Sequence, residues 1–417
     1  MRFLHAADIH LDSPLRGLRA RAGERAEEIA GAPRAAFVRL IDFVIEQKIE
    51  LLLLAGDNWD GGHTDYGSLL FFADQMARLN REGVRVVMIQ GNHDAENQLR
   101  LTMPTNVKML SNRAPRTELF EDLGVAIHGQ SYPRRDVVEN LAAKYPAAVP
   151  GMLNIGLLHT AVTGYAGAHR SYAPCTIQDL RDKSYDYWAL GHVHARTELN
   201  RDPWIVYPGN LQARFLSEAG EKGATLVTVR NGRINEVEHV PLDMVRWATV
   251  NVDVAGCTTQ DQLAGMLQER LRDAMNAAGG RTVAARLVLS GTTPLHFALK
   301  ADADGWLEAE IERAGLDLDH LWFEQVIVAT RQSGGGRVAD SDVVSEVERT
   351  VERIRANTQE RTLLAGQIKE VIDKLVPSLA ELVGQGPDGE VLDPDAILDA
   401  TLNDARDILL GRLTGSS

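Results

Sequence analysis

Five short, continuously apolar runs mark the first half of the chain, and each has the length of a β-strand. They are RFLHA at 2–6, LLLLA at 51–55, VRVVMI at 84–89, IGLL at 155–158 and YWAL at 187–190. Continuous rather than alternating hydrophobicity is typical of strands that are buried on both faces. Between the first two runs, residues 32–47 place apolar side chains at helical spacing. The pattern therefore predicts a layered α/β domain.

The pattern changes in the second half of the chain. Short alternating strands follow residue 204, with a hairpin turn expected at Asn231-Gly232, so the first domain is predicted to span 1–240. Residues 245–330 then show strand and helix patterns in the order β-α-β-α-β. This order predicts a second, small α+β domain.

The last part of the chain differs in composition. The stretch RQSGGGR at 331–337 is typical of a flexible linker, and 338–417 predicts amphipathic helices, the last one capped by Asp393-Pro394. The helical region holds 16 acidic and 8 basic side chains, more than half of the net charge of −14. A negative charge argues against a general DNA scaffold. Because it is concentrated in the tail, it does not exclude an enzyme that acts on phosphodiesters.

A polar side chain that can bind a metal ion follows each of the five apolar runs. In chain order these are Asp8 and His10, Asp57, Asn92 with His93 and Asp94, His159, and His192 with His194. In layered α/β folds, the loops after the strand carboxyl ends gather ligands. A single histidine in such a loop usually has only a packing role, but five successive coincidences favour one shared site.

The collected side chains are carboxylates, an amide and imidazoles, without a cysteine. This set suits six-coordinate divalent ions such as manganese or iron and differs from the thiolate sites of structural zinc. The seven candidates other than His93 and Asp94 are too many for one ion with an open position, whereas two ions that share a bridging carboxylate would use them all. Asp57, a lone carboxylate after a glycine, is the best candidate for the bridge. Two such ions can activate a water molecule and neutralise phosphoryl charge.

The motifs DxH, GD, GNHD, H and GHxH, in this order, resemble those of the calcineurin-like metallophosphoesterases. Within that family, the opening HAADIHLDSPLRGL, the β-α-β-α-β segment and the helical tail are similar to bacterial DNA repair exonucleases of the SbcD and YhaO type. These are relatives of a nuclease subunit that works with an SMC-like ATPase in double-strand break repair. The resemblance implies a calcineurin-like α/β sandwich, followed by a small α+β capping domain and a helical C-terminal tail.

The resemblance also implies roles for individual residues. One ion would bind Asp8, His10, Asp57 and His194, and the other Asp57, Asn92, His159 and His192. His93 would face the scissile phosphate, stabilising the transition state or protonating the leaving oxygen. Asp94 would orient the His93 imidazole. Manganese is the expected metal, with iron and magnesium as alternatives.

Some positions near the motifs allow two interpretations. Asp60 stands where some relatives carry histidine, so a DNA contact at this position stays open. Trp59 would either stack on an unpaired base or pack in the core. The arginines of RGLRARAGER would either contact phosphates or form a solvated face; they are Arg16, Arg19, Arg21 and Arg25.

Location and assembly follow from weaker signals. Two cysteines without a CxxC spacing, no basic-then-apolar leader and no run of 18 apolar residues indicate a cytoplasmic protein without a membrane segment. The tail at 338–417 would either pack on its own catalytic domain or clamp the coiled coil of the ATPase, as the resemblance implies. Similarity also implies a homodimer formed by helices such as the one around 69–79.

The sequence allows three functions to be compared. The first is a metal-dependent DNA exonuclease or endonuclease that acts by a two-metal mechanism in DNA repair. The second is a phosphodiesterase or phosphatase acting on a small nucleotide or phosphoprotein. The third is a non-catalytic scaffold. A scaffold would be expected to have lost some of the metal ligands, and it is disfavoured because all seven candidate ligands are present. The extra domain and the tail favour DNA as the substrate.

Overall fold

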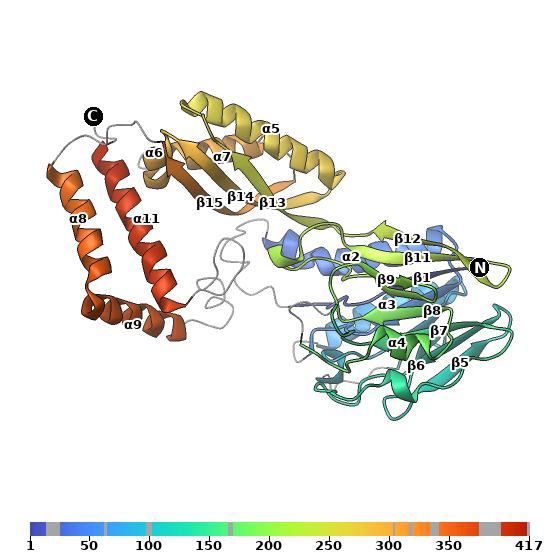
Figure 1. Ribbon diagram of the computed structural model, residues 1–417. Coiled ribbons are helices and arrows are strands. Elements are labelled where there is room, and N and C mark those ends of the chain that lie inside the picture. Colours follow the sequence, from blue (N-terminus) through green and yellow to red (C-terminus); the bar gives the residue numbers. More distant parts are fainter. Residues whose placement is uncertain are drawn as a thin grey trace. The chain divides into compact units, whose positions relative to one another are not determined.

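The computed structural model describes residues 1–13, 26–61, 65–96, 102–165, 170–302, 305–316, 320–333, 342–374 and 393–414. The arginine cluster between Arg16 and Arg25 lies outside the described residues. The chain forms two compact units; the first ends at Arg246 and the second continues from Trp247 (Figure 1). Along the described parts of the chain, no helix combines the length and the apolar character that crossing a membrane requires.

Two six-stranded sheets form the first unit. The first sheet has the order β12-β11-β1-β2-β3-β4, with β1 Arg2–Ala6, β2 Leu51–Ala55, β3 Arg85–Ile89, β4 Val107–Met109, β11 Gly223–Arg230 and β12 Arg233–Pro241. The second has the order β5-β6-β7-β8-β10-β9, with β5 Arg116–Phe120, β6 Val125–Gly129, β7 Leu153–His159, β8 Tyr187–Gly191, β9 Thr197–Arg201 and β10 Trp204–Tyr207. Strands β1 to β4 are parallel, as are β6, β7, β8 and β10.

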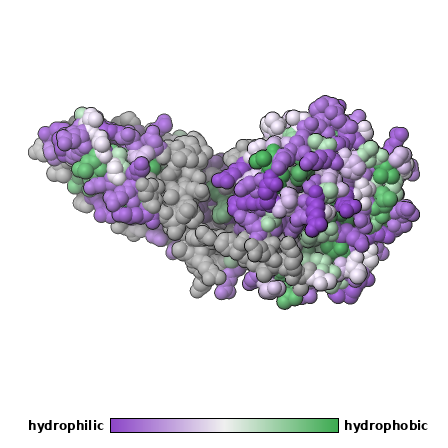
Figure 2. Space-filling view, turned by 90° about the horizontal axis from the view of Figure 1, so that it is seen from below, coloured by the Kyte–Doolittle hydropathy of each residue, from purple (hydrophilic) through white to green (hydrophobic). Residues whose placement is uncertain are grey.

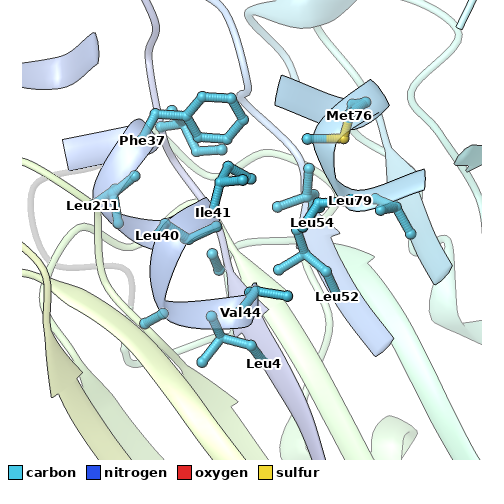
Figure 3. Close-up of a cluster of buried hydrophobic side chains, with 14 of the residues drawn as sticks. Leu4, Phe37, Leu40, Ile41, Val44, Leu52, Leu54, Met76, Leu79 and Leu211 are labelled. Carbon is cyan, nitrogen blue, oxygen red and sulfur yellow. The ribbon is translucent and has the colours of Figure 1, made fainter. Parts of the chain in front are cut away.

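Side chains of β1, β2 and β3 in the first sheet are buried on both faces, as the continuous apolar runs predicted. Leu4, Leu52 and Leu54 pack with helices α2 (Ala26–Glu46) and α3 (Tyr66–Arg81), and Figure 3 shows this cluster. Alternate residues such as Phe3 and Leu53 pack against the second sheet. Because successive side chains of a strand point to opposite faces, strands that are buried on both faces favour apolar residues at successive positions. His5 of β1 is a polar exception, and its ring nitrogens contact the Tyr187 hydroxyl and the Leu190 carbonyl oxygen.

The outer face of the second sheet is covered by a third cluster, which contains Trp188, Tyr145, Tyr185 and Leu180 of α4 (Ile177–Arg181). The predicted hairpin is also present: Asn231 and Gly232 have φ angles of 51° and 72° between β11 and β12. A two-residue turn with both φ angles positive matches the twist of the flanking strands.

The segment around 69–79 is helix α3, whose apolar residues we expected to need the cover of a second subunit. Leu69, Phe72, Met76 and Leu79 are buried in the core of their own unit. The apolar character of these residues is therefore explained by packing within one chain, whereas Leu70 of the same helix is 53% exposed.

The second unit begins with a three-stranded sheet in the order β13-β14-β15. The elements are β13 Val245–Asp253, α5 Gln260–Ala278, β14 Thr282–Thr293, α6 His296–Ala301, α7 Trp306–Leu316 and β15 Leu321–Gln332. Strands β14 and β15 are parallel, and a separate hydrophobic core unites the sheet with α5 and α7. The order matches the predicted β-α-β-α-β pattern, with the short helix α6 added.

Helices α8 (Asp342–Ala356), α9 (Thr358–Lys374) and α11 (Pro394–Thr414) follow. Helix α11 begins as predicted, because Ala396 N donates to Asp393 Oδ1 at 2.7 Å. It packs on α6, where His296 Nε2 lies 3.2 Å from Asp407 Oδ2. We did not predict this contact between the tail and the α+β domain. On the face drawn in Figure 2, the described surface is mainly hydrophilic, with small apolar areas.

Candidate metal centre

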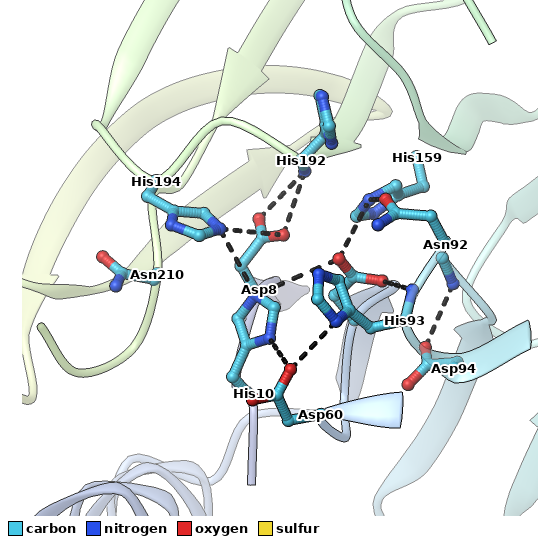
Figure 4. A network of polar contacts seen from close by, with 12 residues as sticks. Asp8, His10, Asp60, Asn92, His93, Asp94, His159, His192, His194 and Asn210 are labelled. Carbon is cyan, nitrogen blue, oxygen red and sulfur yellow. Dashed lines mark hydrogen bonds and ion pairs between the residues drawn. The ribbon is translucent and has the colours of Figure 1, made fainter. Parts of the chain in front are cut away.

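The polar side chains that follow the strands come together, as the sequence predicted. Asp8 and His10 follow β1, Asp57 follows β2, Asn92 and His93 follow β3, His159 ends β7, and His192 and His194 follow β8. Figure 4 labels these residues, apart from Asp57, and shows their side chains close together. Parallel strands bring their carboxyl ends to one edge, so residues far apart in sequence share one location.

One group of ligand atoms belongs to Asp8, His10 and His194, which offer atoms within 4.8 Å of one another. The Nε2 atoms of His10 and His194 are 3.3 Å apart, and Asp8 Oδ1 lies 3.9 Å from His194 Nε2. Two imidazole nitrogens and a carboxylate oxygen that face the same point suit a divalent cation.

A second group consists of Asp8, Asp57 and His159. Asp57 Oδ2 lies 3.4 Å from His159 Nε2 and 3.9 Å from His10 Nε2, so this carboxylate lies between the two groups. Asn92 Oδ1 is 3.1 Å from His159 Nε2. The position of the Asp57 carboxylate, between the two groups, is the one that a bridging ligand requires.

The hydrogen bonds of His159 show that the second group fits a cation. Its Nδ1 lies 2.9 Å from the Ala55 carbonyl oxygen, which can only accept, so Nδ1 carries a hydrogen. In the neutral ring, the lone pair of Nε2 therefore faces the oxygens of Asn92 and Asp57. Three acceptors that face one another need either a proton or a metal ion between them.

The His192 side chain lies differently from the prediction. Its backbone N–H donates to both carboxylate oxygens of Asp8, at 3.1 and 2.9 Å. Its ring Nε2 is 2.8 Å from the Arg170 carbonyl oxygen, and the ring packs edge-on against His159 with centroids 5.3 Å apart. The structure therefore brings six of the seven predicted ligands together and turns the seventh toward the backbone.

The backbone is strained at several candidate ligands. Asp8, His10 and Asp57 have φ angles of 51°, 46° and 50°, and His192 has 110°. Residues with a side chain rarely adopt positive φ, and such strain persists only where the surrounding structure enforces it. Its concentration at these four residues indicates a functional site.

Two motif glycines are required by close packing around the same residues. A Cβ atom on Gly91 would lie 2.3 Å from Asp57 Oδ1, and one on Gly191 would lie 2.1 Å from the Ala55 carbonyl oxygen. Any side chain at these positions would push the strand ends apart, so the glycines allow the candidate ligands to approach one another.

The charges of the buried groups depend on their neighbours. Burial alone would raise the pKa of Asp57, but His159 and His10 hold that pKa well below its usual value, so the carboxylate is ionised. Burial disfavours the protonated form of His159, yet Asp57 and Asp8 raise its pKa to about 9. Burial and the charge of Arg214 lower the pKa of His10 to about 3, so this ring is neutral, as a metal ligand must be.

Comparison with known proteins decides the family. The calcineurin-like phosphoesterase family matches residues 1–196, and the middle domain of metallophosphoesterase YhaO matches 247–331. An uncharacterized metallophosphoesterase YhaO from Bacillus subtilis (strain 168) is 35% identical over 330 residues, which cover 77% of this chain and 80% of that protein. The chain belongs to the calcineurin-like metallophosphoesterases.

More distant similarities were also found. The DNA double-strand break repair protein Mre11 from Methanopyrus kandleri is 28% identical over 297 residues, covering 63% of this chain and 61% of that protein. Among solved structures, a dimetal phosphatase from Danio rerio aligns with a TM-score of 0.33 and 10% identity, over 55% of this chain and 93% of that one. The family and the paired sheets confirm the predicted calcineurin-like α/β fold, which carries a helical C-terminal tail.

The partner of His93 in this metallophosphoesterase differs from our expectation. His93 Nδ1 lies 2.9 Å from Asp60 Oδ1, as Figure 4 shows. The Asp94 carboxylate instead accepts from Asn58 Nδ2 and from the backbone N–H groups of Trp59 and Gly91, at 2.9–3.1 Å. Asp60, not Asp94, is thus placed to orient the imidazole, and Asp94 joins the loops after β2 and β3.

The position of Trp59 favours one of its two interpretations. Its side chain is 3% exposed and its ring packs against Phe72, with centroids 4.9 Å apart. Burial in this core leaves no ring face on which a base could stack.

Sequence reasoning missed three residues behind His194. Glu218 Oε1 lies 2.7 Å from His194 Nδ1, and Glu218 also binds Asn210 and Arg214. No periodicity marks these residues; an arginine and a glutamate four positions apart are the only local signal.

Proposed function

We propose that this metallophosphoesterase is a DNA nuclease that hydrolyses phosphodiester bonds with two divalent metal ions. The observation that carries the chemistry is the position of Asp57 between two groups of buried imidazoles and carboxylates. A shared carboxylate of this kind supports a two-ion centre. Similarity to a DNA double-strand break repair protein supports DNA as the substrate.

The ligands fall into two sets. Asp8, His10, Asp57 and His194 would hold one ion, and Asp57, Asn92 and His159 the other. His192 would complete the second set if its ring left the Arg170 carbonyl oxygen for the ion. When bound, the ions supply an activated water molecule and neutralise charge on the phosphoryl oxygens. Manganese suits the mixture of imidazole and oxygen ligands, with iron and magnesium as alternatives.

His93 is proposed as the proton donor to the leaving oxygen. Its side chain is 31% exposed, more than the other residues of the centre, and Asp60 holds Nδ1, so Nε2 is the nitrogen available to the substrate. Burial lowers the tendency of the ring to protonate, but Asp60 and Asp57 raise the pKa of His93 above its ordinary value of 6.5. A ring that is protonated near neutral pH can act as a general acid.

The remaining parts of the proposal concern assembly. The second unit supports a large substrate or partner, because hydrolysis of a small phosphoester needs only the first. We propose that 338–417 binds an SMC-like ATPase, that the protein forms a homodimer and that it acts in DNA repair. The described cysteines, Cys175 and Cys257, are unpaired, which accords with a cytoplasmic location.

The test is a cleavage assay with purified protein and manganese. Linear double-stranded DNA, single-stranded DNA and a chromogenic phosphodiester are incubated in parallel, with and without an ATPase partner. His93→Ala protein, prepared identically, controls for contaminating nucleases. We expect metal-dependent DNA cleavage by the wild-type protein and none by His93→Ala. Hydrolysis of the small diester without any DNA cleavage would instead support a phosphodiesterase or phosphatase of small substrates.

A further inference from the structure

A buried polar network lies behind His194. Glu218 Oε1 is 2.7 Å from His194 Nδ1, and because a carboxylate only accepts, Nδ1 carries the hydrogen and Nε2 keeps its lone pair for the metal centre. Glu218 also accepts from Arg214 Nη2 at 3.0 Å, from the Arg214 backbone N–H at 2.8 Å and from Asn210 Nδ2 at 2.9 Å. These bonds hold Glu218 and the ring in one arrangement.

Arg214 is the member of this network whose contacts are incomplete. Its side chain is only 12% exposed, and its Nε is buried without a hydrogen-bond partner among the described residues. The guanidinium reaches Glu218 through Nη2 alone, and Nη2 also lies 3.4 Å from His194 Nδ1. An arginine that serves only as a counter-ion usually binds a carboxylate through two parallel hydrogen bonds. In this structure, most N–H groups of the Arg214 guanidinium have no acceptor within the part of the chain that is described.

The positive charge of Arg214 affects the pKa values of residues in the candidate centre. It lowers the pKa of His10 and opposes the rise in that of His93, while Asp60 and Asp8 favour its protonated form. The geometry places the guanidinium beside the centre, because its Nη2 lies 3.4 Å from Nδ1 of the candidate ligand His194. A fixed cation with unused donors, next to a centre for phosphoester hydrolysis, has the chemistry of a phosphate-binding residue.

We propose that Arg214 binds a non-bridging oxygen of the substrate phosphate group, and that Glu218 positions both Arg214 and His194. This inference rests on the phosphoester chemistry of the proposed function, but not on DNA as the substrate. Arg214 is the residue that would contact the substrate, whereas Glu218 acts through its neighbours.

The experiment compares Arg214→Met, which removes the cation but keeps the aliphatic stem, with the wild-type protein. Elemental analysis of gel-filtered protein measures bound manganese, and titration calorimetry measures the affinity of manganese-loaded protein for inorganic phosphate. We expect two ions in both proteins and a dissociation constant for phosphate that is about 10- to 100-fold higher in Arg214→Met. Arg201→Met, which removes an exposed arginine paired with Glu198, is the matched control and should bind phosphate normally.

Glu218→Gln tests the positioning role. It should weaken manganese binding by about 10- to 100-fold, because the neutral amide oxygen is a weaker acceptor for His194 Nδ1–H than the carboxylate and no longer anchors Arg214 by charge. Arg214→Lys keeps the charge without the planar donors; it replaces Arg214→Met if that variant does not fold, and should also bind phosphate more weakly.

Several outcomes would overturn the inference. Unchanged phosphate affinity in Arg214→Met, with both ions retained, would make Arg214 a counter-ion of Glu218 only. Loss of manganese from Arg214→Met would show that Arg214 acts on the metal ligand His194 and not on the substrate. If manganese-loaded wild-type protein did not bind phosphate, the proposed phosphate subsite would be wrong. A wild-type protein that hydrolyses a small diester but no DNA would contradict the nuclease proposal and leave this result interpretable.

Discussion

Asp60 lies between two imidazoles of the centre. Its Oδ1 atom is 2.9 Å from His93 Nδ1 and 3.6 Å from His10 Nδ1, and Ser13 Oγ donates to its other oxygen at 2.8 Å. Burial alone would raise its pKa, but these neighbours hold the pKa of Asp60 well below its usual value. The residue is thus an anion at neutral pH, which suits the orientation of a protonated His93.

The first prediction concerns His93 itself. His93→Ala should retain both manganese ions, because His93 is not among the proposed ligands, but should lose about 10²- to 10⁴-fold in kcat, the usual contribution of a general acid. Elemental analysis and turnover of a chromogenic diester measure the two effects. Loss of metal from the variant would show that His93 is a ligand.

The second prediction separates Asp60 from Asp94. Asp60→Asn removes the anion beside His93, so the pKa of His93 should fall. Since a general acid must be protonated, kcat declines as pH rises through that pKa, and this alkaline limb should move to lower pH in Asp60→Asn. Asp94→Asn is the control variant, and the alkaline limb of its pH profile should stay at the wild-type pH. If the limb moved in Asp94→Asn but not in Asp60→Asn, Asp94 would be the residue that interacts with His93.

The third prediction concerns His159 in the metal-free protein. Its folded-state pKa of about 9 lies above the ordinary 6.5, so its ion pair with Asp57 stabilises the fold fully below about pH 6.5, and that stability is lost as pH rises toward 9. Manganese must displace the proton of His159. Calorimetry in buffers of different protonation enthalpy should therefore detect proton release on binding at pH 7.5 and much less above pH 9. Equal release at both values would contradict the assignment.

At the scale of elements, the strongest apolar patterns predicted the strands that carry the site. β1 and β2 match the expected residues, and β7 extends the expected run at both ends. Strands β4 and β5, in contrast, are partly exposed, so they have no continuous apolar run, and β4 is only three residues long. β6 is fully buried, but its sequence VAIHG ends in His128-Gly129, which masks its pattern.

The fourth prediction tests the contact between α11 and α6. A Cβ atom on Gly411 of α11 would lie 2.2 Å from the Phe297 carbonyl oxygen, so Gly411→Ala should separate the helices and lower the thermal stability of the second unit. Gly366→Ala on α9 is the matched control. Nothing lies within 4 Å of an added Cβ there, so it should gain about 0.5–1 kcal/mol from better helix propensity. Calorimetry measures the unfolding temperature of the second unit in both variants. Equal effects of the two substitutions would contradict the close packing of α11 on α6.

At the scale of the whole molecule, each unit has its own hydrophobic core. The first unit contains three buried clusters and the second a separate one around β14 and α5. Units with independent cores can fold independently. All the residues of the candidate centre belong to the first unit, so a metal ion that binds there stabilises this unit directly.

The fifth prediction follows from this division. Calorimetry of the full chain should show two unfolding transitions, and manganese should raise the temperature of only one. At 100 times its dissociation constant, a ligand stabilises the unit that binds it by about 2.7 kcal/mol. The chelated protein is the control. A single transition that shifts as a whole would show that the two units unfold together.

The sequence alone determined five of the buried strands, β1, β2, β3, β7 and β8, and the polar residues that follow them. Burial on both faces favours apolar residues along the strand, and such a run ends where the chain must turn, so both features are visible locally. The convergence of Asp8 and Asp57 also followed, because β1 and β2 are parallel neighbours. His159 joins them because the second sheet packs against the first.

Only the tertiary structure decided which polar groups pair with one another. Asp60 rather than Asp94 contacts His93, the His192 ring turns to the Arg170 carbonyl oxygen, and Glu218 holds His194. Each pairing depends on the path of a loop and the orientation of a side chain within about 3 Å, which no periodic pattern encodes. The packing of α11 on α6 was hidden for the same reason, because an apolar helix face does not specify the surface that will cover it.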